Sequence, residues 1–263
     1  MNKKMLLKHM PFIILLFSFN TIANETLNVG SDVWCPYICS EAHKPGVLIE
    51  VLNEIAKHND LVINFKVIPL ARSLVLLQQS KLDMVLALTD EHIKESHLKR
   101  SLKAYGGWYN DFYVLQTNQW KFSSIKNLKK HIEQDNTLGI IKGYKYGNGI
   151  AQLQESSGQH IFSATGNSPL SNLLMMLSKK RISMVVDSRF NVEYEIQNSN
   201  ISNLKYAGTE GDFVPLYIGY APKSQVKYID VFDKGLTRLR ATGQLSNILK
   251  RYGIPDWQAK NLD

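Results

Sequence analysis

Short apolar runs rich in β-branched residues alternate along this chain with longer stretches of helical periodicity. In the stretch 47–58, apolar residues recur at intervals of three and four, as on one face of an α-helix. The segment 84–88, by contrast, is an unbroken apolar run of strand length. This alternation of strand and helix patterns predicts an α/β fold with a largely parallel sheet.

The expected elements fall into two series. The first has strands over 27–30, 62–67 and 84–88 and helices over 47–58 and 71–79. The second has strands over 137–141, 160–163, 182–186 and 204–207 and helices over 148–155, 169–179 and 190–196. Aromatic-rich extended runs over 105–115 and 213–221 bracket the second series, and helices over 226–240 and 245–252 close the chain. This order predicts two lobes: lobe 1 from 24–112 and 215–263, and an inserted lobe 2 from 113–214.

The first residues have the layout of a secretory signal peptide. Lys3, Lys4 and Lys8 precede the apolar run 11–19, and small residues follow as far as Ala23. The apolar run is shorter than the roughly 20 residues of a membrane-spanning helix. We therefore expect residues 1–23 to be a signal peptide cleaved near Ala23, and a periplasmic protein. The alternative is an uncleaved N-terminal anchor.

The positive charge of the chain is spread rather than clustered. The formal net charge is +8, and loss of the three N-terminal lysines leaves about +5. The short basic run 179–181 lies at the end of an expected helix, where cations suit the negative end of the helix dipole. Nucleic-acid binding is therefore not expected.

Cys35 and Cys39 are the two cysteines of the chain. In an oxidising compartment a local disulfide between them is the natural interpretation. The bond would close a small loop and stiffen a turn more than it would stabilise the whole fold. A metal site would need further ligands, and no Cys or His cluster supplies them nearby. We expect neither a metal nor a cofactor.

Several segments of the chain, in this order and spacing, resemble the family 3 bacterial extracellular solute-binding proteins. The segments are Asp32 with Trp34, Pro36 and Tyr37; 45–47 with Glu50 and Glu54; 69–72; 82–83; 89–91; Gly139 with Gly143; and 181–187. The resemblance implies a type II periplasmic-binding-protein-like fold, with two α/β lobes joined by two β crossovers that form a hinge. It also implies capture of polar amino acids or related solutes for an ABC importer, by a monomer without catalytic activity.

One position departs from the resemblance. Many amino-acid binders of this family follow the first-lobe Thr-x-Glu motif with an arginine that clamps the ligand's carboxylate, and His92 stands there in this chain. Arg72 begins a helix directly after a strand and is a candidate substitute clamp. Its alternative is a place on the helix surface.

Asp187 and Arg189 form the second-lobe end of the expected site. Asp187 follows an apolar strand, so its carboxylate could receive an ammonium group at the strand's carboxyl end. The alternative role is an N-cap for the next helix. Arg189 could pair with Asp187 or contact the ligand.

The remaining candidate ligand-binding residues lie in loops that follow strands. They are Asp32, Trp34, Tyr37, Thr89, His92, Tyr144 and Lys145. Aromatic side chains such as Trp34 and Tyr37 could pack on a ligand or belong to the core. Free backbone amides in the turn 143–147 could hold an anion, while Lys145 could simply be solvated.

These features predict a solute-binding protein that closes around its ligand by hinge motion. A membrane sensor rather than an ABC permease is an alternative partner. A dehydratase-like enzyme on the same fold is a third possibility, but no nucleophile motif, Gly-rich phosphate loop or metal-ligand spacing supports it.

Overall fold

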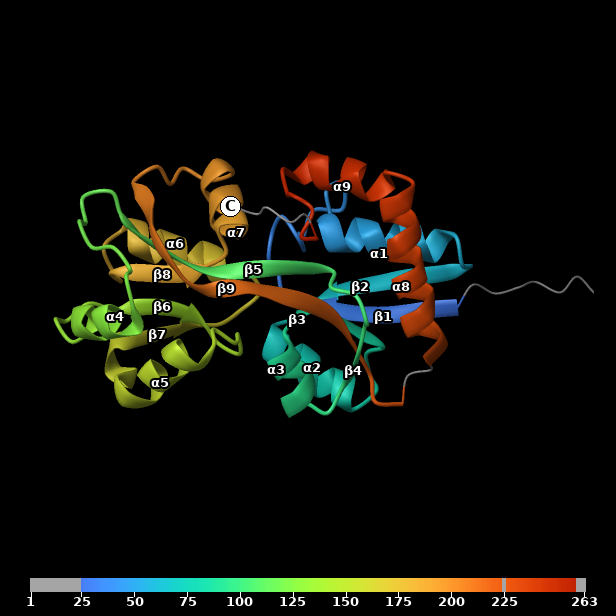
Figure 1. Cartoon of the computed structure of the whole chain (residues 1–263), viewed down its shortest axis with the longest axis horizontal. Helices are drawn as coiled ribbons and strands as arrows, with labels where there is room; N and C mark the ends of the chain where they lie inside the picture. Colours follow the sequence, from blue (N-terminus) through green and yellow to red (C-terminus); the bar gives the residue numbers. More distant parts are fainter. Residues whose placement is uncertain (1–24, 224–225, 259–263) are drawn as a thin grey trace, which may run out of the picture.

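A computed structural model describes residues 25–223 and 226–258. The signal peptide predicted over 1–23 lies outside these residues. The described chain is an α/β structure built around one curled sheet of strand order β2-β1-β3-β9-β5-β8-β6-β7, with β4 paired to β9. Figure 1 shows the elements gathered into two lobes, with β5 and β9 running between them.

In its described residues the first lobe contains three parallel strands, a fourth short strand that pairs antiparallel with β9, and five helices. Its strands are β1 (Glu25–Ser31), β2 (Leu61–Val67), β3 (Met84–Leu88) and the short β4 (Lys99–Arg100). Its helices are α1 (Val47–Lys57), α2 (Leu70–Gln78), α3 (Asp90–Glu95), α8 (Val226–Ala241) and α9 (Gln244–Tyr252). Helices α1, α8 and α9 cover one face of the sheet, and α2 and α3 cover the other (Figure 1).

The apolar face of α1 explains how this lobe holds together. Its periodic apolar residues are buried, and the helix packs against both α8 and α9. Gly235 of α8 lies where a Cβ atom would come within 2.5 Å of Ile55 Cγ2. The two helices therefore approach more closely than a side chain at position 235 allows.

The second lobe repeats the same layered plan. Its parallel strands are β6 (Leu138–Ile141), β7 (Ile161–Ala164) and β8 (Met184–Asp187). Its helices are α4 (Ile125–Ile132), α5 (Asn148–Ser156), α6 (Pro169–Ser178) and α7 (Arg189–Gln197), with a short 3-10 turn over Gly158–His160. Helices α6 and α7 lie on one side of these strands and α4 and α5 on the other (Figure 1).

Strands β5 (Gly106–Leu115) and β9 (Leu204–Tyr220) join the lobes. They pair antiparallel along most of their length, from Gly106 opposite Leu216 to Leu115 opposite Leu204, with two register shifts. Strand β9 also pairs with β3 of the first lobe, while β5 pairs with β8 of the second. Two continuous strands thus carry the chain across the junction.

The expected order of elements is confirmed, with two differences. The runs expected over 204–207 and 213–221 form one strand, β9, because pairing to β5 continues as far as Glu210 and resumes at Val214 after a register shift. Helices α3 and α4 and the short strand β4 were not expected from the sequence. The boundaries proposed for the lobes, at 112–113 and 214–215, fall within β5 and β9.

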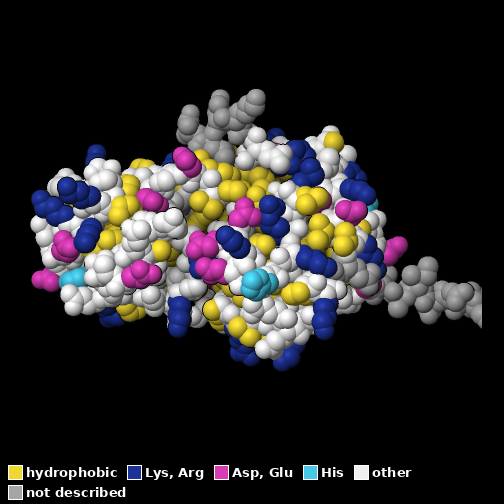
Figure 2. All heavy atoms as spheres, turned by 60° about the horizontal axis from the view of Figure 1, so that its bottom comes forward, with side chains coloured by type: hydrophobic (Ala, Val, Ile, Leu, Met, Phe, Trp, Pro, Cys, Tyr) yellow, Lys and Arg dark blue, Asp and Glu magenta, His cyan; other side chains and the backbone are white. Residues whose placement is uncertain are grey.

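The surface carries no concentrated basic patch on the face that Figure 2 shows. Lys and Arg side chains are spread across it and alternate with acidic and apolar ones. Among the described residues, none of the helices has the length and apolar character needed to cross a bilayer.

Candidate functional site

A small cavity lies where the loops of the two lobes meet. It has room for about 20 Å³ of solvent, enough for about one water molecule. It is lined by Asp32, Trp34, Leu70, Leu86, Ala87, Thr89, His92, Trp108, Tyr144, Lys145 and Leu216. Several of these residues directly follow the carboxyl ends of β1, β3 and β6, which is where α/β sheets place ligand sites.

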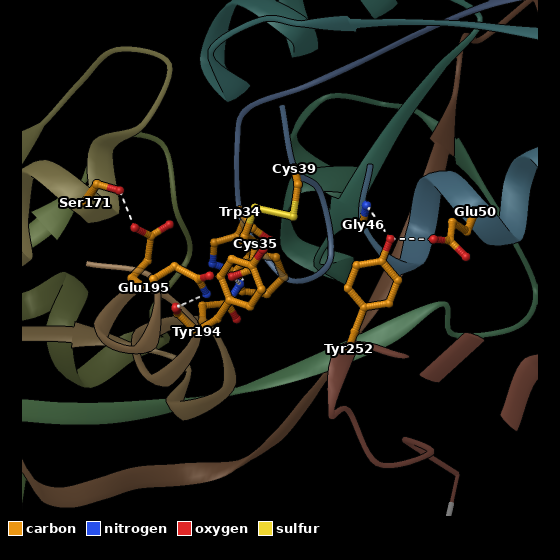
Figure 3. Close-up of a disulfide and its surroundings, with 11 residues drawn as sticks. Trp34, Cys35, Cys39, Gly46, Glu50, Ser171, Tyr194, Glu195 and Tyr252 are labelled. Atoms are coloured by element: carbon orange, nitrogen blue, oxygen red, sulfur yellow. Dashed lines mark hydrogen bonds between the residues drawn. A yellow bond between two sulfur atoms is a disulfide. The ribbon is translucent and has the colours of Figure 1, made fainter. Parts of the chain in front are cut away.

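The loop after β1 is held rigidly by its own backbone. Trp34 and Ile38 form an isolated bridge, and a disulfide joins Cys35 to Cys39 (Figure 3). Gly46, at φ +102°, lets the backbone return against this loop, because a Cβ there would lie 2.5 Å from the Tyr37 carbonyl oxygen. These contacts fix the position from which Trp34 faces the cavity.

Helix α9 braces the same loop from outside. The Tyr252 hydroxyl accepts a hydrogen bond from the Gly46 amide and donates one to Glu50 of α1 (Figure 3).

Among the described residues, Cys35, Cys39 and Glu41 bring potential metal-ligand atoms within 4.8 Å of one another. The two sulfurs are bonded to each other, so this loop is a braced turn in the structure.

Three aromatic rings meet almost at right angles beside the cavity. Trp34 and Trp108 lie 6.2 Å apart at 75°, Trp34 and Tyr144 6.5 Å apart at 89°, and Trp108 and Tyr144 6.0 Å apart at 79°. Trp34 comes from the first lobe, Tyr144 from the second, and Trp108 from the connecting strand β5. The rings form an aromatic corner that includes parts of both lobes.

Two buried carboxylates accompany this aromatic corner. Asp32 is 4% exposed and accepts a hydrogen bond of 3.2 Å from the Tyr144 hydroxyl. Asp187 is fully buried. Its Oδ1 accepts hydrogen bonds from Trp34 Nε1 at 3.0 Å and from the Ser188 amide, and no described residue bonds to its Oδ2. Burial raises the pKa of Asp32 and that of Asp187 to about 7, because the low-dielectric interior disfavours the charged form.

The His92 side chain is buried and bonded to groups of both lobes. It takes part in a capping box with Thr89 at the start of α3, and its Nε2 lies 2.8 Å from the Gly143 carbonyl of the second lobe. Burial lowers the pKa of His92, although the contact with Gly143 acts in the opposite direction. Its ring is therefore a bridge between the lobes.

Further contacts join the two lobes around the cavity. The Asn191 side chain of α7 donates to the backbone carbonyls of Trp34 and Cys35, and the Val33 amide donates to the Asn167 carbonyl. Together with the Trp34–Asp187 and Tyr144–Asp32 bonds, these contacts describe a closed arrangement. Any ligand larger than a water molecule needs some of them to open.

The basic side chains predicted for the site have other surroundings. Arg189 forms a bidentate pair with buried Asp111 of β5, at 3.0 Å for both contacts. Lys145 lines the cavity but also contacts Glu95 at 2.6 Å and Glu91 at 3.5 Å. Burial acts to lower the pKa of Lys145, but these two glutamates together raise it above its ordinary value.

The structure brings together six of the ten candidate ligand-binding residues as cavity lining: Asp32, Trp34, Thr89, His92, Tyr144 and Lys145. Asp187 lies against Trp34, and Tyr37 is buried with its ring stacked on Trp34 and its hydroxyl donating to the Gly107 carbonyl. Arg72 is exposed on α2 and does not line the cavity.

Sequence reasoning did not place Trp108 or Ala87 in the cavity. Trp108 lies in a strand that connects the lobes, and its position in the sequence pattern does not show whether it packs in the hinge or contacts a ligand. Ala87 has a positive φ of 59° at an irregularity in the β3–β9 pairing. No feature of the sequence signals that bulge, which turns the chain at the cavity wall.

Solved structures with the same arrangement identify the fold. An ancestral arginine-binding protein bound to arginine is 21% identical, with a TM-score of 0.71 over 88% of this chain and 99% of that one. A putative L-cystine ABC transporter protein from Listeria monocytogenes is 19% identical, with a TM-score of 0.70 over 87% and 95%. A histidine kinase sensor domain similar to periplasmic binding proteins is 15% identical, with a TM-score of 0.72 over 88% and 96%. The fold is that of the type II periplasmic binding proteins.

The sequence makes the assignment more specific. The chain belongs to the bacterial extracellular solute-binding proteins, family 3, whose family model matches residues 27–255. No curated protein sequence matches the chain significantly. The fold and the family are those of binding proteins, as the sequence predicted.

Proposed function

We propose that this protein captures a small polar solute, an amino acid or a related compound, between its two lobes and delivers it to an ABC importer. The observation that supports this proposal most strongly is the cavity at the lobe junction. Buried Asp32 lines it together with aromatic side chains from both lobes, and buried Asp187 is bonded to Trp34 of the same lining. Buried carboxylates without a cationic partner are costly unless a ligand compensates them.

Capture works by hinge closure. Residues 24–112 and 215–263 form one body and 113–214 the other, with β5 and β9 as the flexible connection. Ligand first meets one lobe and then bridges both, so its additional contacts stabilise the closed form. Catalysis forms no part of this proposal.

Export to the periplasm fits the same proposal. Residues 1–23 direct secretion and are removed near Ala23. The family is one of extracellular proteins, and the disulfide between Cys35 and Cys39 suits an oxidising compartment.

A thermal-shift screen tests the capture of a solute. Protein expressed from the full-length gene is purified, stripped of ligand by unfolding and refolding, and heated with amino acids, amines, small carboxylates and sugars. A true ligand raises the melting temperature steadily with the logarithm of its concentration above the Kd, because it binds the folded state alone. A panel without any concentration-dependent rise contradicts the proposal.

A sensor role is the second candidate. The structural likeness to a histidine kinase sensor domain favours it. In that case the closed form docks to a membrane receptor instead of a permease. Co-purification of the ligand-loaded protein with solubilised membranes separates the two, because the captured partner is either a transport subunit or a kinase.

A further inference from the structure

The charge balance of the cavity is uneven. Neither Asp32 nor Asp187 forms an ion pair with any residue in the described part of the chain. Within residues 25–223 and 226–258, the Tyr144 hydroxyl is the one side-chain donor to Asp32, and Oδ2 of Asp187 has no donor. Two buried carboxyl groups left in this way are stable either as neutral acids or, when ionised, beside positive charge from a ligand.

The neighbouring basic groups are committed to other acids. Arg189 neutralises Asp111, which would otherwise face Asp187 across the β5–β8 pairing as a second buried negative charge. Lys145 contacts Glu91 and Glu95. Among the described residues that line the cavity, no arginine is available to pair with a ligand carboxylate.

The aromatic corner is suited to a cation as well. Trp34, Trp108 and Tyr144 all line the cavity, and their rings stand close to perpendicular to one another, so much of the cavity wall is aromatic. Aromatic faces attract ammonium and guanidinium groups, and the attraction grows when water is excluded. A carboxylate placed against the same faces is repelled by their negative electron density.

From this charge pattern we infer that the ligand is a small organic cation without a carboxylate, such as a diamine or a guanidino-amine. Its cationic groups are held by Asp32 and Asp187 against the aromatic corner. The Tyr144 hydroxyl occupies the place at Asp32 that one ligand nitrogen takes, so Tyr144 must withdraw when the ligand enters. This inference rests on the proposed function and specifies its ligand class.

Matched pairs of compounds test the inference on the unaltered protein. Agmatine and arginine differ by one carboxylate, as do cadaverine and lysine, and putrescine and ornithine. Calorimetric titration of the ligand-stripped protein, at a pH about one unit above the raised pKa values of the two acids, measures all six affinities. At least one amine is expected to bind about tenfold more tightly, or better, than its amino-acid partner.

The outcomes separate this inference from the proposed function. If arginine, lysine or ornithine binds more tightly than every amine, the inference is overturned and solute capture stands. If none of the six compounds binds, the inference is overturned, and the wider thermal-shift panel decides solute capture. A tighter amine supports both.

Variants then locate the cationic groups. Asp32→Asn and Asp187→Asn are each expected to weaken the amine by about tenfold or more while leaving side-chain volume almost unchanged. Asp230→Asn, which removes an exposed carboxylate on α8, is the matched control and should leave the affinity unchanged. Equal affinities for all three variants and the parent would overturn the assignment, provided that circular dichroism shows each to be folded.

Discussion

Burial of Asp32 and Asp187 determines how single residues of this protein respond to pH. Each carboxyl group has an ordinary pKa of 3.8, whereas in the folded protein the pKa is raised to about 7. Between these values the folded state binds more protons than the unfolded chain. The contribution to stability is therefore fully present below the ordinary pKa and is lost as the pH rises through about 7.

Replacement of Asp187 by Asn should flatten this dependence. The parent should lose more stability than the Asp187→Asn variant between about pH 5 and about pH 8, because the variant has no charge to bury there. Urea unfolding midpoints at several pH values provide the measurement. Parallel profiles for the two proteins would contradict the raised pKa.

Over the same range, affinity for a cationic ligand should rise, because the ionised carboxylates bind it.

Tyr144 offers a test that separates a ring from its hydroxyl. If the ligand replaces the Tyr144 hydroxyl on Asp32, Tyr144→Phe should change affinity by no more than about threefold. Tyr144→Ala also removes the aromatic face and should cost about tenfold or more. Calorimetry with the tightest amine of the panel makes the comparison. A loss in Phe as large as that in Ala would show that the hydroxyl itself contacts the ligand.

The sequence predicted part of the site because several polar and aromatic residues come soon after the end of a predicted strand. Asp32, Trp34, His92 and Tyr144 could be placed at strand ends, and strand ends converge. The environment of Arg189 could not be predicted, because its partner Asp111 lies far away in sequence and is brought close by the pairing of β5 with β8. Side-chain pairing across strands depends on register, which the local pattern does not contain.

At the scale of elements, helical periodicity predicted helices correctly where one face of the helix is apolar over several turns. Helix α1 was predicted nearly to its ends. Helix α4 was missed because it is short, rich in lysine and buries only Leu128 and Ile132. The single strand β9 was expected as two runs because glycines and acidic residues interrupt its apolar pattern.

The close approach of α1 and α8 should make position 235 sensitive to size. Gly235→Ala places a methyl group against Ile55, a β-branched residue with little freedom to move. Overpacking of this kind costs about 1–3 kcal/mol, which outweighs the helix-propensity gain of about 1 kcal/mol. Chemical unfolding should therefore show destabilisation. Lys234→Ala, at an exposed neighbouring position, is the control, and a more stable Gly235→Ala would refute the packing argument.

The disulfide loop should affect ligand binding more than global stability. For a loop this short the chain-entropy model gives about 2 kcal/mol, or roughly 4–8 °C in melting temperature for a protein of this size. The double variant Cys35→Ser, Cys39→Ser should therefore fold. It should bind ligand more weakly, because the braced loop positions Trp34. Unchanged affinity would mean that the backbone bridge alone suffices.

At the scale of the whole molecule, two strands connect two lobes whose loops meet over a cavity with room for about one water molecule. Contacts such as His92 to Gly143 and Trp34 to Asp187 cross this junction. Because the cavity is so small, ligand entry requires the lobes to separate. Most of the binding free energy must then come from contacts that the two lobes make with the ligand as they close around it.

A crystal structure of the protein with the tightest compound from the screen tests this account most directly. We predict that the compound lies between the lobes, against Trp34 and Tyr144, with a cationic group at Asp32 or Asp187. The structure also has a polar groove on the outside of the first lobe, between α1 and α9. A compound bound there, with the lobe junction unchanged, would contradict capture between the lobes.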